Sequence, residues 1–189
     1  MKAVVQRVLS SSVSVKGQQV GAIGKGLTVL LGVGHDDDAV DVEWMAQKLV
    51  NLRIFEDEKA KMNRSLLDEK GSMLIISQFT LFGDCEKGRR PSFTGAGEPG
   101  KAKALYEAFI QAVEALGVPT ASGIFQADMQ VSILNDGPVT LIVETPPRQK
   151  KLAKGTMSHL NLPPKEQEKF DEEAALVRRN LQLRKQQKG

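Results

Sequence analysis

The sequence predicts an α/β protein in which a mixed, curved, barrel-like β-sheet packs against two helices. Three observations favour this class. Stretches with the apolar pattern of strands outnumber stretches with helical spacing. The two helical stretches, residues 36–50 and 101–116, interrupt the strands and do not follow them as a block. The 189 residues are 41% hydrophobic and 26% charged, as in ordinary globular proteins, so a stable core is expected.

Strands dominate the start of the chain. Residues 2–9 are rich in valine and are predicted to form one strand. Residues 12–15 and 20–23 are predicted to pair as a hairpin, because the residues at 16–19 between them favour a turn. The continuous apolar run over residues 27–33 is typical of a strand that is buried on both faces.

The three aspartates Asp36-Asp37-Asp38 predict the start of a helix that continues to about Val50, because carboxylates stabilise a helix N-terminus. A cation site is the less favoured alternative, since the segment lacks the glycine and the terminal glutamate of a calcium-binding loop. A short strand is expected over residues 52–55, and the polar residues 56–70 are expected to be mostly loop. One face of the helix carries Val42, Met45, Ala46 and Leu49.

The second half of the chain is predicted to hold a strand over residues 73–82 and a long surface loop over residues 83–100. Residues 129–134 and 139–144 are predicted as two strands. The residues between them, Asn135-Asp136-Gly137-Pro138, favour a hairpin turn. The intervening helix over residues 101–116 carries Leu105, Phe109, Val113 and Leu116 on one stripe, and Pro119 begins an extended stretch after it.

Pro146-Pro147 divides the chain into a domain of residues 1–145 and a C-terminal extension of residues 146–189, because proline pairs end regular structure. The extension is predicted to contain a linker and then an amphipathic helix over about residues 164–187. It carries 11 Lys and Arg against 5 Asp and Glu, a net charge of +6, whereas the rest of the chain carries −3. A basic arm for nucleic acid and a solvated appendage explain this charge equally well.

Several classes of protein are disfavoured. The single cysteine, Cys85, allows no intramolecular disulfide, and no run of about 18 apolar residues could span a membrane. We therefore expect a cytoplasmic protein. The two histidines, His35 and His159, do not neighbour a candidate nucleophile in sequence, and no zinc-ligand spacing or phosphate-binding glycine loop is present. A triad hydrolase, a metalloenzyme and a nucleotide-driven enzyme are disfavoured, and neither a metal nor a cofactor is expected.

Three polar segments are candidates for function. Ser77-Gln78-Phe79-Thr80-Leu81 would place two hydroxyls and an amide at the end of a buried strand, near N–H groups that could stabilise an oxyanion. Asn135-Asp136-Gly137-Pro138-Val139-Thr140 could hold a cis Gly–Pro bond, although most such bonds are trans. Lys87-Gly88-Arg89-Arg90-Pro91 could bind phosphates. From composition alone, an ordinary strand, a turn and a solvated loop are the favoured alternatives.

Taken together, these segments resemble the D-aminoacyl-tRNA deacylase family, formerly known through D-tyrosyl-tRNA deacylase. The motifs at residues 77–81 and 135–140 match the two signatures of that family in register. The resemblance covers about residues 1–145 and departs at Gln126, where glycine is frequent in the family. Four further segments look like the family in the expected order: Val5-Gln6-Arg7-Val8, Asn51-Leu52-Arg53-Ile54-Phe55-Glu56-Asp57, Arg90-Pro91-Ser92-Phe93 and Phe125-Gln126-Ala127-Asp128-Met129.

The resemblance implies a hydrolase that proofreads chirality in translation by cleaving the ester of D-aminoacyl-tRNA. It implies a homodimer with active sites at the subunit interface. A cis Gly137–Pro138 element would enter the partner's pocket, meet the α-amino group of the substrate and exclude an L side chain. Arg7 would brace this element. Such a backbone filter would also accept glycine, so glycyl-tRNA is expected to be a substrate.

The resemblance also implies the roles of the remaining site residues. Ser77, Gln78, Phe79 and Thr80 would line the pocket around the aminoacyl carbonyl. Phe125 and Met129 would contact the terminal adenosine, and Ala102 would lie near the bound aminoacyl group. Because no base is recognisable, we expect Thr80 to position the substrate and the ribose 2′-hydroxyl to take part in the reaction. A nucleophilic Thr80 is the alternative.

Two other functions are open from the sequence. One is a nucleic-acid-binding module without chemistry, which would use Arg89, Arg90 and the basic extension. This function does not explain why both family signatures are present. The other is a dimeric interaction protein that has lost activity. That alternative is disfavoured because Thr80 and Gly137–Pro138 are both present.

Overall fold

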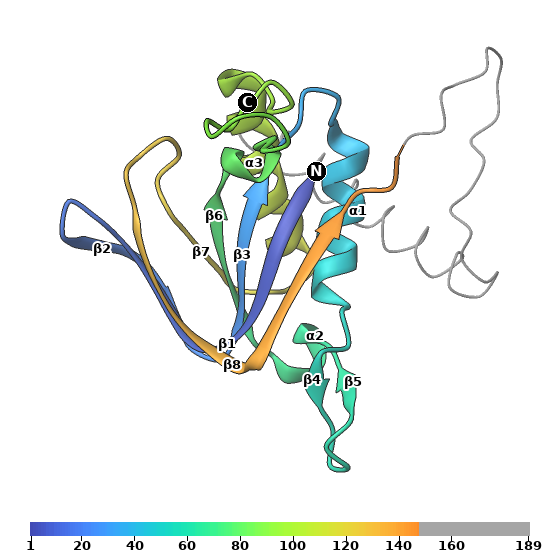
Figure 1. Ribbon diagram of the computed structural model, residues 1–189. Coiled ribbons are helices and arrows are strands. Elements are labelled where there is room, and N and C mark those ends of the chain that lie inside the picture. The colour runs from blue at the N-terminus through green and yellow to red at the C-terminus, as the bar shows by residue number, and fades with distance from the viewer. Residues whose placement is uncertain (148–189) are drawn as a thin grey trace, which may run out of the picture.

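A computed structural model describes residues 1–147, which form a strongly curved six-stranded sheet with helices on one side (Figure 1). The strands follow the order β2-β1-β3-β6-β7, and β8 pairs along β1. The β1–β3 and β1–β8 pairs are antiparallel, whereas β3–β6 and β6–β7 are parallel, so the predicted mixed sheet is confirmed. The strands are β1 (Lys2–Val15), β2 (Gln18–Ile23), β3 (Gly26–Gly32), β6 (Ser72–Ser77), β7 (Thr120–Ser122) and β8 (Gln130–Glu144).

The curvature brings the edge strands β2 and β7 together, which makes the sheet barrel-like. A Cβ atom on Gly21 of β2 would lie 2.9 Å from the carbonyl oxygen of Ser122 in β7, closer than real Cβ contacts. Glycine therefore permits the approach of the two edges, as it does where one backbone comes close to another. The predicted barrel-like sheet is confirmed.

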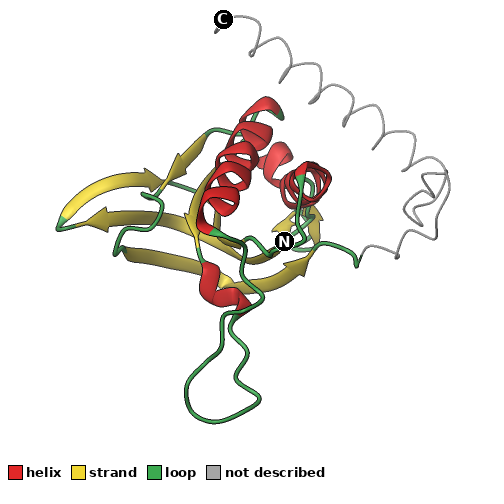
Figure 2. Cartoon of the chain, turned by 90° about the horizontal axis from the view of Figure 1, so that it is seen from above, coloured by secondary structure: helices red, strands yellow, loops and turns green. Residues whose placement is uncertain are grey.

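Two helices, α1 (Ala39–Val50) and α3 (Pro99–Ala115), cover the same side of the sheet (Figure 2). The predicted apolar face of α1 is buried against β3 and its neighbours. On α3, Phe109 and Val113 are fully buried, whereas Leu105 and Leu116 are only partly buried. Burial of a side chain such as Phe109 contributes about 1.5–3 kcal/mol. No helix within residues 1–147 is long and apolar enough to cross a membrane.

The aspartate cluster begins α1, as predicted. Asp38 is the N-cap, and its carboxylate accepts a hydrogen bond of 2.9 Å from the N–H of Val40. Asp41 completes a capping box by accepting from the N–H of Asp38. Asp37 accepts from the N-terminal ammonium of Met1 and from the N–H of Gly34, each at 2.6 Å. Asp37 and Asp38 thus hold the N-terminus and begin the helix.

The prediction for residues 52–70 is wrong. The strand begins later than predicted, as β4 (Phe55–Glu56), and pairs with β5 (Met62–Arg64) in a hairpin that is followed by α2 (Leu66–Glu69). Side-chain hydrogen bonds form this structure, including a capping box between Ser65 and Asp68. Apolar periodicity does not report such bonds, so the sequence alone predicts a loop there.

Three strand boundaries also differ from the prediction. β1 is one strand of 14 residues, and its hairpin with β2 turns at Lys16 and Gly17, which both have positive φ angles. β6 ends at Ser77, where the chain enters the 3₁₀ helix η1 (Phe79–Phe82). The apolar pattern continues through η1, which is why the sequence predicts a strand to residue 82. The other strand correction concerns β8 and is described with the site.

Residues 148–189 lie outside the described part of the chain. The predicted linker over residues 148–162 and the predicted helix over residues 164–187 therefore stay predictions. The same holds for the boundary that separates a domain of residues 1–145 from a C-terminal extension.

Candidate active site

The first signature lies where β6 ends and η1 begins. The N–H of Gln78 donates to the carbonyl of Leu31 at 2.8 Å, which holds the junction on the neighbouring strand β3. Phe79 and Thr80 occupy the first turn of η1, and the first N–H groups of a helix have no acceptor inside that helix. These two N–H groups are therefore available as donors to a ligand at this end of the sheet.

The side chains of this signature are accessible. The amide of Gln78 donates to the hydroxyl oxygen of Thr80 at 2.5 Å. The ring of Phe79 is 58% exposed and contacts Phe93 edge to face, with 5.1 Å between ring centroids. Among the described residues no carboxylate, imidazole or amine contacts the Thr80 hydroxyl, so Thr80 has no general base next to it.

A hollow of about 340 Å³ lies between α3 and the segment after β7, and β7 pairs with β6, the strand that ends at this signature. Phe125 forms part of its wall, and its ring lies 5.9 Å from that of Tyr106. The Tyr106 hydroxyl donates to the carbonyl of Ile75, two residues before Ser77. Burial raises the pKa of Tyr106 to about 12, so this residue acts as a neutral donor.

The structure also places Met129 and Ala102 near this end of the sheet. Met129 packs with Ile76 of β6, and a side chain at position 123 would collide with the Met129 sulfur. Ala102 is partly buried in the first turns of α3, one turn before Tyr106. The described fold therefore brings residues 77–80, Ala102, Phe125 and Met129 to one end of the central strands.

The second signature is not a hairpin turn, and that prediction is wrong. β8 is a single strand that pairs with β1 on both sides of the signature, through Val8 with Asn135 and Gln6 with Thr140. Residues 136–139 therefore bulge opposite Arg7 alone. The long partner strand overrides the local preference for a turn. The Asn135 side chain spans the bulge, because it accepts from the N–H of Val139 and donates to the Thr140 hydroxyl.

Arg7 is 5% exposed and contacts this bulge directly. One Nη atom donates to the carbonyl of Ile54 at 2.7 Å. Its Nε lies 2.9 Å from an Asp136 carboxylate oxygen, as an ion pair without the alignment of a hydrogen bond. Gly137 has a φ of +116°, and a Cβ atom there would lie 2.9 Å from the other Nη of Arg7. The Gly137–Pro138 peptide bond is cis.

The two signatures lie at opposite ends of the central strands. Arg7 pairs with Leu27, which pairs with Met73, whereas Ser77 pairs with Leu31. The two levels are thus four residues apart, or about 13 Å at roughly 3.3 Å per residue. One protomer therefore places the first signature and the Phe125 hollow at the same end of the sheet, and Gly137 and Pro138 at the other end.

Comparison with known proteins decides the family. Residues 4–144 match the model of the family described as D-Tyr-tRNA(Tyr) deacylase. The chain belongs to this family. A D-aminoacyl-tRNA deacylase of Pelobacter propionicus is 59% identical over 144 residues, which are 76% of this chain and 99% of that protein. Another from Geotalea uraniireducens is 56% identical over 158 residues, covering 84% of this chain and all of that protein.

Two solved structures share the deacylase fold. One is that of a protein described as a c-Myc DNA Unwinding Element Binding Protein. It is 43% identical with a TM-score of 0.74, and the match covers 78% of this chain and all of that protein's chain. The second is that of a probable eukaryotic D-amino acid tRNA deacylase. It is 20% identical with a TM-score of 0.65, covers 75% of this chain and 97% of its own, and supports the fold alone.

The fold explains the departure from the deacylase pattern at Gln126. Gln126 has a φ of +63°, in the left-handed region that glycine adopts without strain. A non-glycine residue there costs about 1–2 kcal/mol. The glycine that is frequent in the family therefore fits the backbone, and Gln126 keeps the same conformation at that cost while lining the hollow.

Sequence reasoning missed two residues of the candidate site in this deacylase. Tyr106 is the only tyrosine of the chain, and this unique polar ring on a helix could have drawn attention to it. Asp136 belongs to a segment with the composition of a turn, although its carboxylate faces the buried Arg7. Only the pairing of β1 with β8 brings Asp136 and Arg7 together, so no local signal could have found this contact.

Proposed function

We propose that this deacylase hydrolyses the ester bond between a D-amino acid and tRNA, as a chirality check on translation in the cytoplasm. The observation that carries the proposal is the junction at Gln78, where two helix-start N–H groups lie at the same end of the sheet as the Phe125 hollow. The hollow has room for an adenosine, and an aromatic wall suits a base by stacking. Relatives at 56–59% identity that carry the deacylase name support the same activity.

The reaction needs few catalytic groups from the protein, because an aminoacyl ester is already activated. Water attacks the carbonyl carbon, the ester bond to the ribose breaks, and the ribose oxygen takes up the proton. The N–H groups of Phe79 and Thr80 stabilise the oxyanion. Gln78 holds the Thr80 hydroxyl, which positions the ester, and the neighbouring 2′-hydroxyl of the substrate helps to move the proton.

The chirality filter is assembled from two subunits in this proposal. Gly137 and Pro138 lie about 13 Å along the strands from the level of Ser77 in the same protomer, so they reach a first signature only in a second copy. Exposed apolar side chains away from the helices suit such a homodimer. Ile142 is 74% exposed on the sheet face opposite Leu141 and Val143, which pack toward the helices.

The filter works by exclusion. The carbonyls of the Gly137–Pro138 element meet the α-amino group, and the element leaves no space for an L side chain. Because the filter is backbone, it accepts many D side chains and also glycine, so glycyl-tRNA is a second substrate. Arg7 supports the element through Asp136 and through its contact with Gly137.

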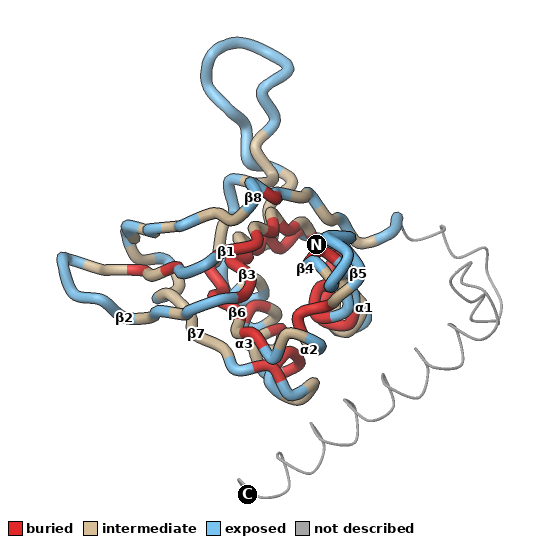
Figure 3. Tube along the Cα trace, turned by 90° about the horizontal axis from the view of Figure 1, so that it is seen from below, coloured by how far each residue is buried: buried red, intermediate tan, exposed pale blue. Residues whose placement is uncertain are grey.

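The loop after η1 offers the cations that the RNA backbone needs. Lys87, Arg89 and Arg90 are exposed on this loop, which stands out from the body (Figure 3). A bridge between Asp84 and Ser92 closes its base beside Phe79 and Phe93. We assign this loop to the phosphates next to the aminoacylated end.

The test compares the hydrolysis of D-Tyr-tRNA and L-Tyr-tRNA at nanomolar to micromolar enzyme. The unaltered protein should release tyrosine only from the D ester and without added metal. Pro138→Ala should begin to release tyrosine from the L ester. Hydrolysis of neither ester by a folded dimer would overturn the proposal.

Binding of nucleic acid without chemistry is a second candidate. The observation that favours it is the 43% identity to the protein described as a DNA unwinding element binding protein. This function predicts salt-dependent binding to duplex DNA, weakened by Arg89→Ala and Arg90→Ala. Tight DNA binding by a chain that hydrolyses neither ester would favour this candidate over the deacylase.

A further inference from the structure

The contact between Arg7 and Ile54 links the second signature to a surface hairpin. Arg7 reaches Asp136 and Gly137 on one side and donates to the Ile54 carbonyl on the other. Ile54 directly precedes β4, and the β4–β5 hairpin stands at the end of the molecule away from η1 (Figure 1). The position of Arg7 therefore depends on how firmly this hairpin holds the Ile54 carbonyl.

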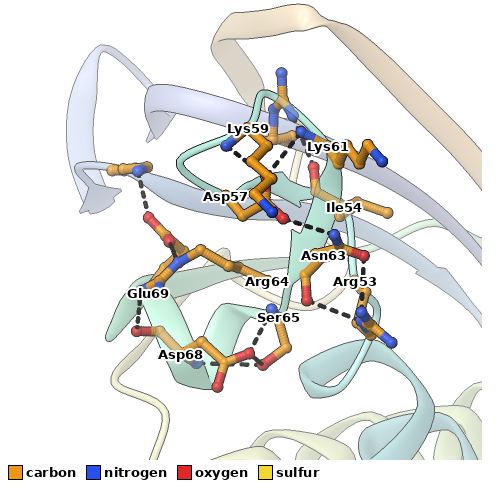
Figure 4. A network of polar contacts seen from close by, with 12 residues as sticks. Arg53, Ile54, Asp57, Lys59, Lys61, Asn63, Arg64, Ser65, Asp68 and Glu69 are labelled. Atoms are coloured by element: carbon orange, nitrogen blue, oxygen red, sulfur yellow. Dashed lines mark hydrogen bonds and ion pairs between the residues drawn. The ribbon is translucent and has the colours of Figure 1, made fainter.

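Both neighbours of Ile54 are fixed. Arg53 binds Asn63 on the opposite side of the hairpin in two ways, from Nε to the carbonyl at 2.8 Å and from Nη to the side-chain oxygen at 2.7 Å (Figure 4). Phe55 is 2% exposed and pairs with Arg64. The Ile54 carbonyl thus lies between the residue that makes the bidentate contact, Arg53, and the residue with the buried ring, Phe55.

Asp57 holds Asn63 in place. The amide of Asn63 donates to one Asp57 oxygen at 2.6 Å, and the N–H groups of Lys59 and Lys61 donate to the other at 2.9 and 3.0 Å. These hydrogen bonds, first the one from Asn63, lower the pKa of Asp57. Asp57 is therefore ionised at neutral pH, and it orients the turn together with Asn63.

We propose that Asp57 and Asn63 are positioning residues for the D/L discrimination of this enzyme. Through Arg53 they hold the Ile54 carbonyl, and through that carbonyl they hold Arg7 against Asp136 and Gly137. The inference rests on the proposed function, since it gives the filter a support outside the pocket. Neither side chain touches the substrate in this arrangement.

A separate cluster anchors the base of the hairpin, so loss of the Asp57–Asn63 contact should leave the hairpin folded. Glu69 pairs with both Lys25 and Arg64, and Lys25 also lies over the buried Phe55 ring. The donors for the oxyanion are about 13 Å away along the strands. A looser hairpin therefore changes the filter and leaves the hydrolytic end intact.

The experiment measures kcat/KM for D-Tyr-tRNA and L-Tyr-tRNA with Asn63→Ala and Asp57→Ala. The L ester should be hydrolysed about tenfold faster, a loss of about 1.4 kcal/mol of discrimination, while the D ester changes less than about threefold. Asp57→Asn keeps an acceptor oxygen, so its rate on the L ester should lie between that of the unaltered protein and that of Asp57→Ala. Lys61→Ala is the matched control, because Lys61 joins the network only through its backbone N–H and carbonyl.

Each other outcome overturns the inference. Equal losses for the D and L esters, together with a lower Tm, would show a structural role only. An unchanged L rate in Asn63→Ala, when Pro138→Ala raises it, would remove the hairpin from the filter and leave the proposed function standing. Failure of the unaltered protein to hydrolyse D-Tyr-tRNA would overturn both.

Discussion

The two ends of the central strands hold their functional residues in opposite ways. At the carboxyl end of β6, Phe79 and Thr80 are exposed, and their side chains contact only the partly buried Gln78 and the exposed Phe93. At the other end, a buried Arg7 fixes the bulge of β8 from inside the fold. In the proposed function, hydrolysis needs an open approach for a large substrate, whereas discrimination needs a rigid element. The difference teaches that access and rigidity are placed at separate ends of one sheet.

The largest expected effect on the difference between the two ends is the removal of Arg7. Arg7→Ala leaves the Ile54 carbonyl and the Asp136 carboxylate without their cation, so the free energy of unfolding should fall by about 3 kcal/mol. Urea denaturation measures this change. Gln6→Ala, on the neighbouring residue with a single exposed side-chain contact, is the control and should cost less than about 1 kcal/mol. Equal effects of the two substitutions would show that Arg7 is not the brace.

Acidification should loosen the β4–β5 hairpin beside the proposed filter, while the contact of Gln78 with Leu31 holds. The hydrogen bonds of Asp57, first from Asn63, and those of Asp68, first from the Ser65 backbone, lower the pKa of both carboxylates. Stability from such groups is present above the unfolded pKa and is lost as the pH falls through the lower folded pKa. The loss therefore begins below about pH 4.

Hydrogen exchange measures this difference at pH 5 and pH 3. The amides of Lys59 and Lys61 should lose protection at pH 3, while the amide of Gln78, which donates to Leu31, keeps it. Asp57→Ala should remove the pH dependence at the two lysine amides. Simultaneous loss at all three amides would indicate global acid unfolding and would refute the local effect.

The sequence predicted the parts of the fold that follow from apolar periodicity. The stripe with Val42 and Met45 located α1, and the unbroken apolar run before Gly34 located the buried strand β3. The family signatures located the residues at the end of β6. Apolar periodicity carried no information about the β4–β5 hairpin, because polar contacts such as that between Asp57 and Asn63 form it.

The bulge of β8 could not be predicted for a different reason. Its residues, Asn135 to Pro138, have the composition of a turn, and only pairing with β1 on both sides makes them a bulge. This pairing joins residues far apart in sequence. For the same reason, the contact of Asp136 with Arg7 was not predictable from either segment alone.

A smaller effect is expected at the open end. Thr80→Ala should keep the rate on D-Tyr-tRNA within about tenfold, because no base within residues 1–147 contacts Thr80 and its proposed role is to position the ester. Single-turnover kinetics measure the rate of the chemical step, and Thr94→Ala in the adjoining loop is the control. A trapped acyl-Thr80 species would instead make Thr80 the nucleophile.

The smallest expected effect is at Gln126, where a substitution tests whether the backbone conformation or the side chain matters to the Phe125 hollow. Gln126→Gly should raise the free energy of unfolding by about 1 kcal/mol, since glycine adopts the positive φ without strain. Lys16→Gly relieves a similar φ of 50° in the β1–β2 turn and should stabilise the fold equally, without any change in KM. If Gln126→Gly also leaves KM unchanged, the hollow needs only the backbone conformation at this position. A higher KM would instead show that the Gln126 side chain binds the substrate, and a loss of stability would contradict the strain argument.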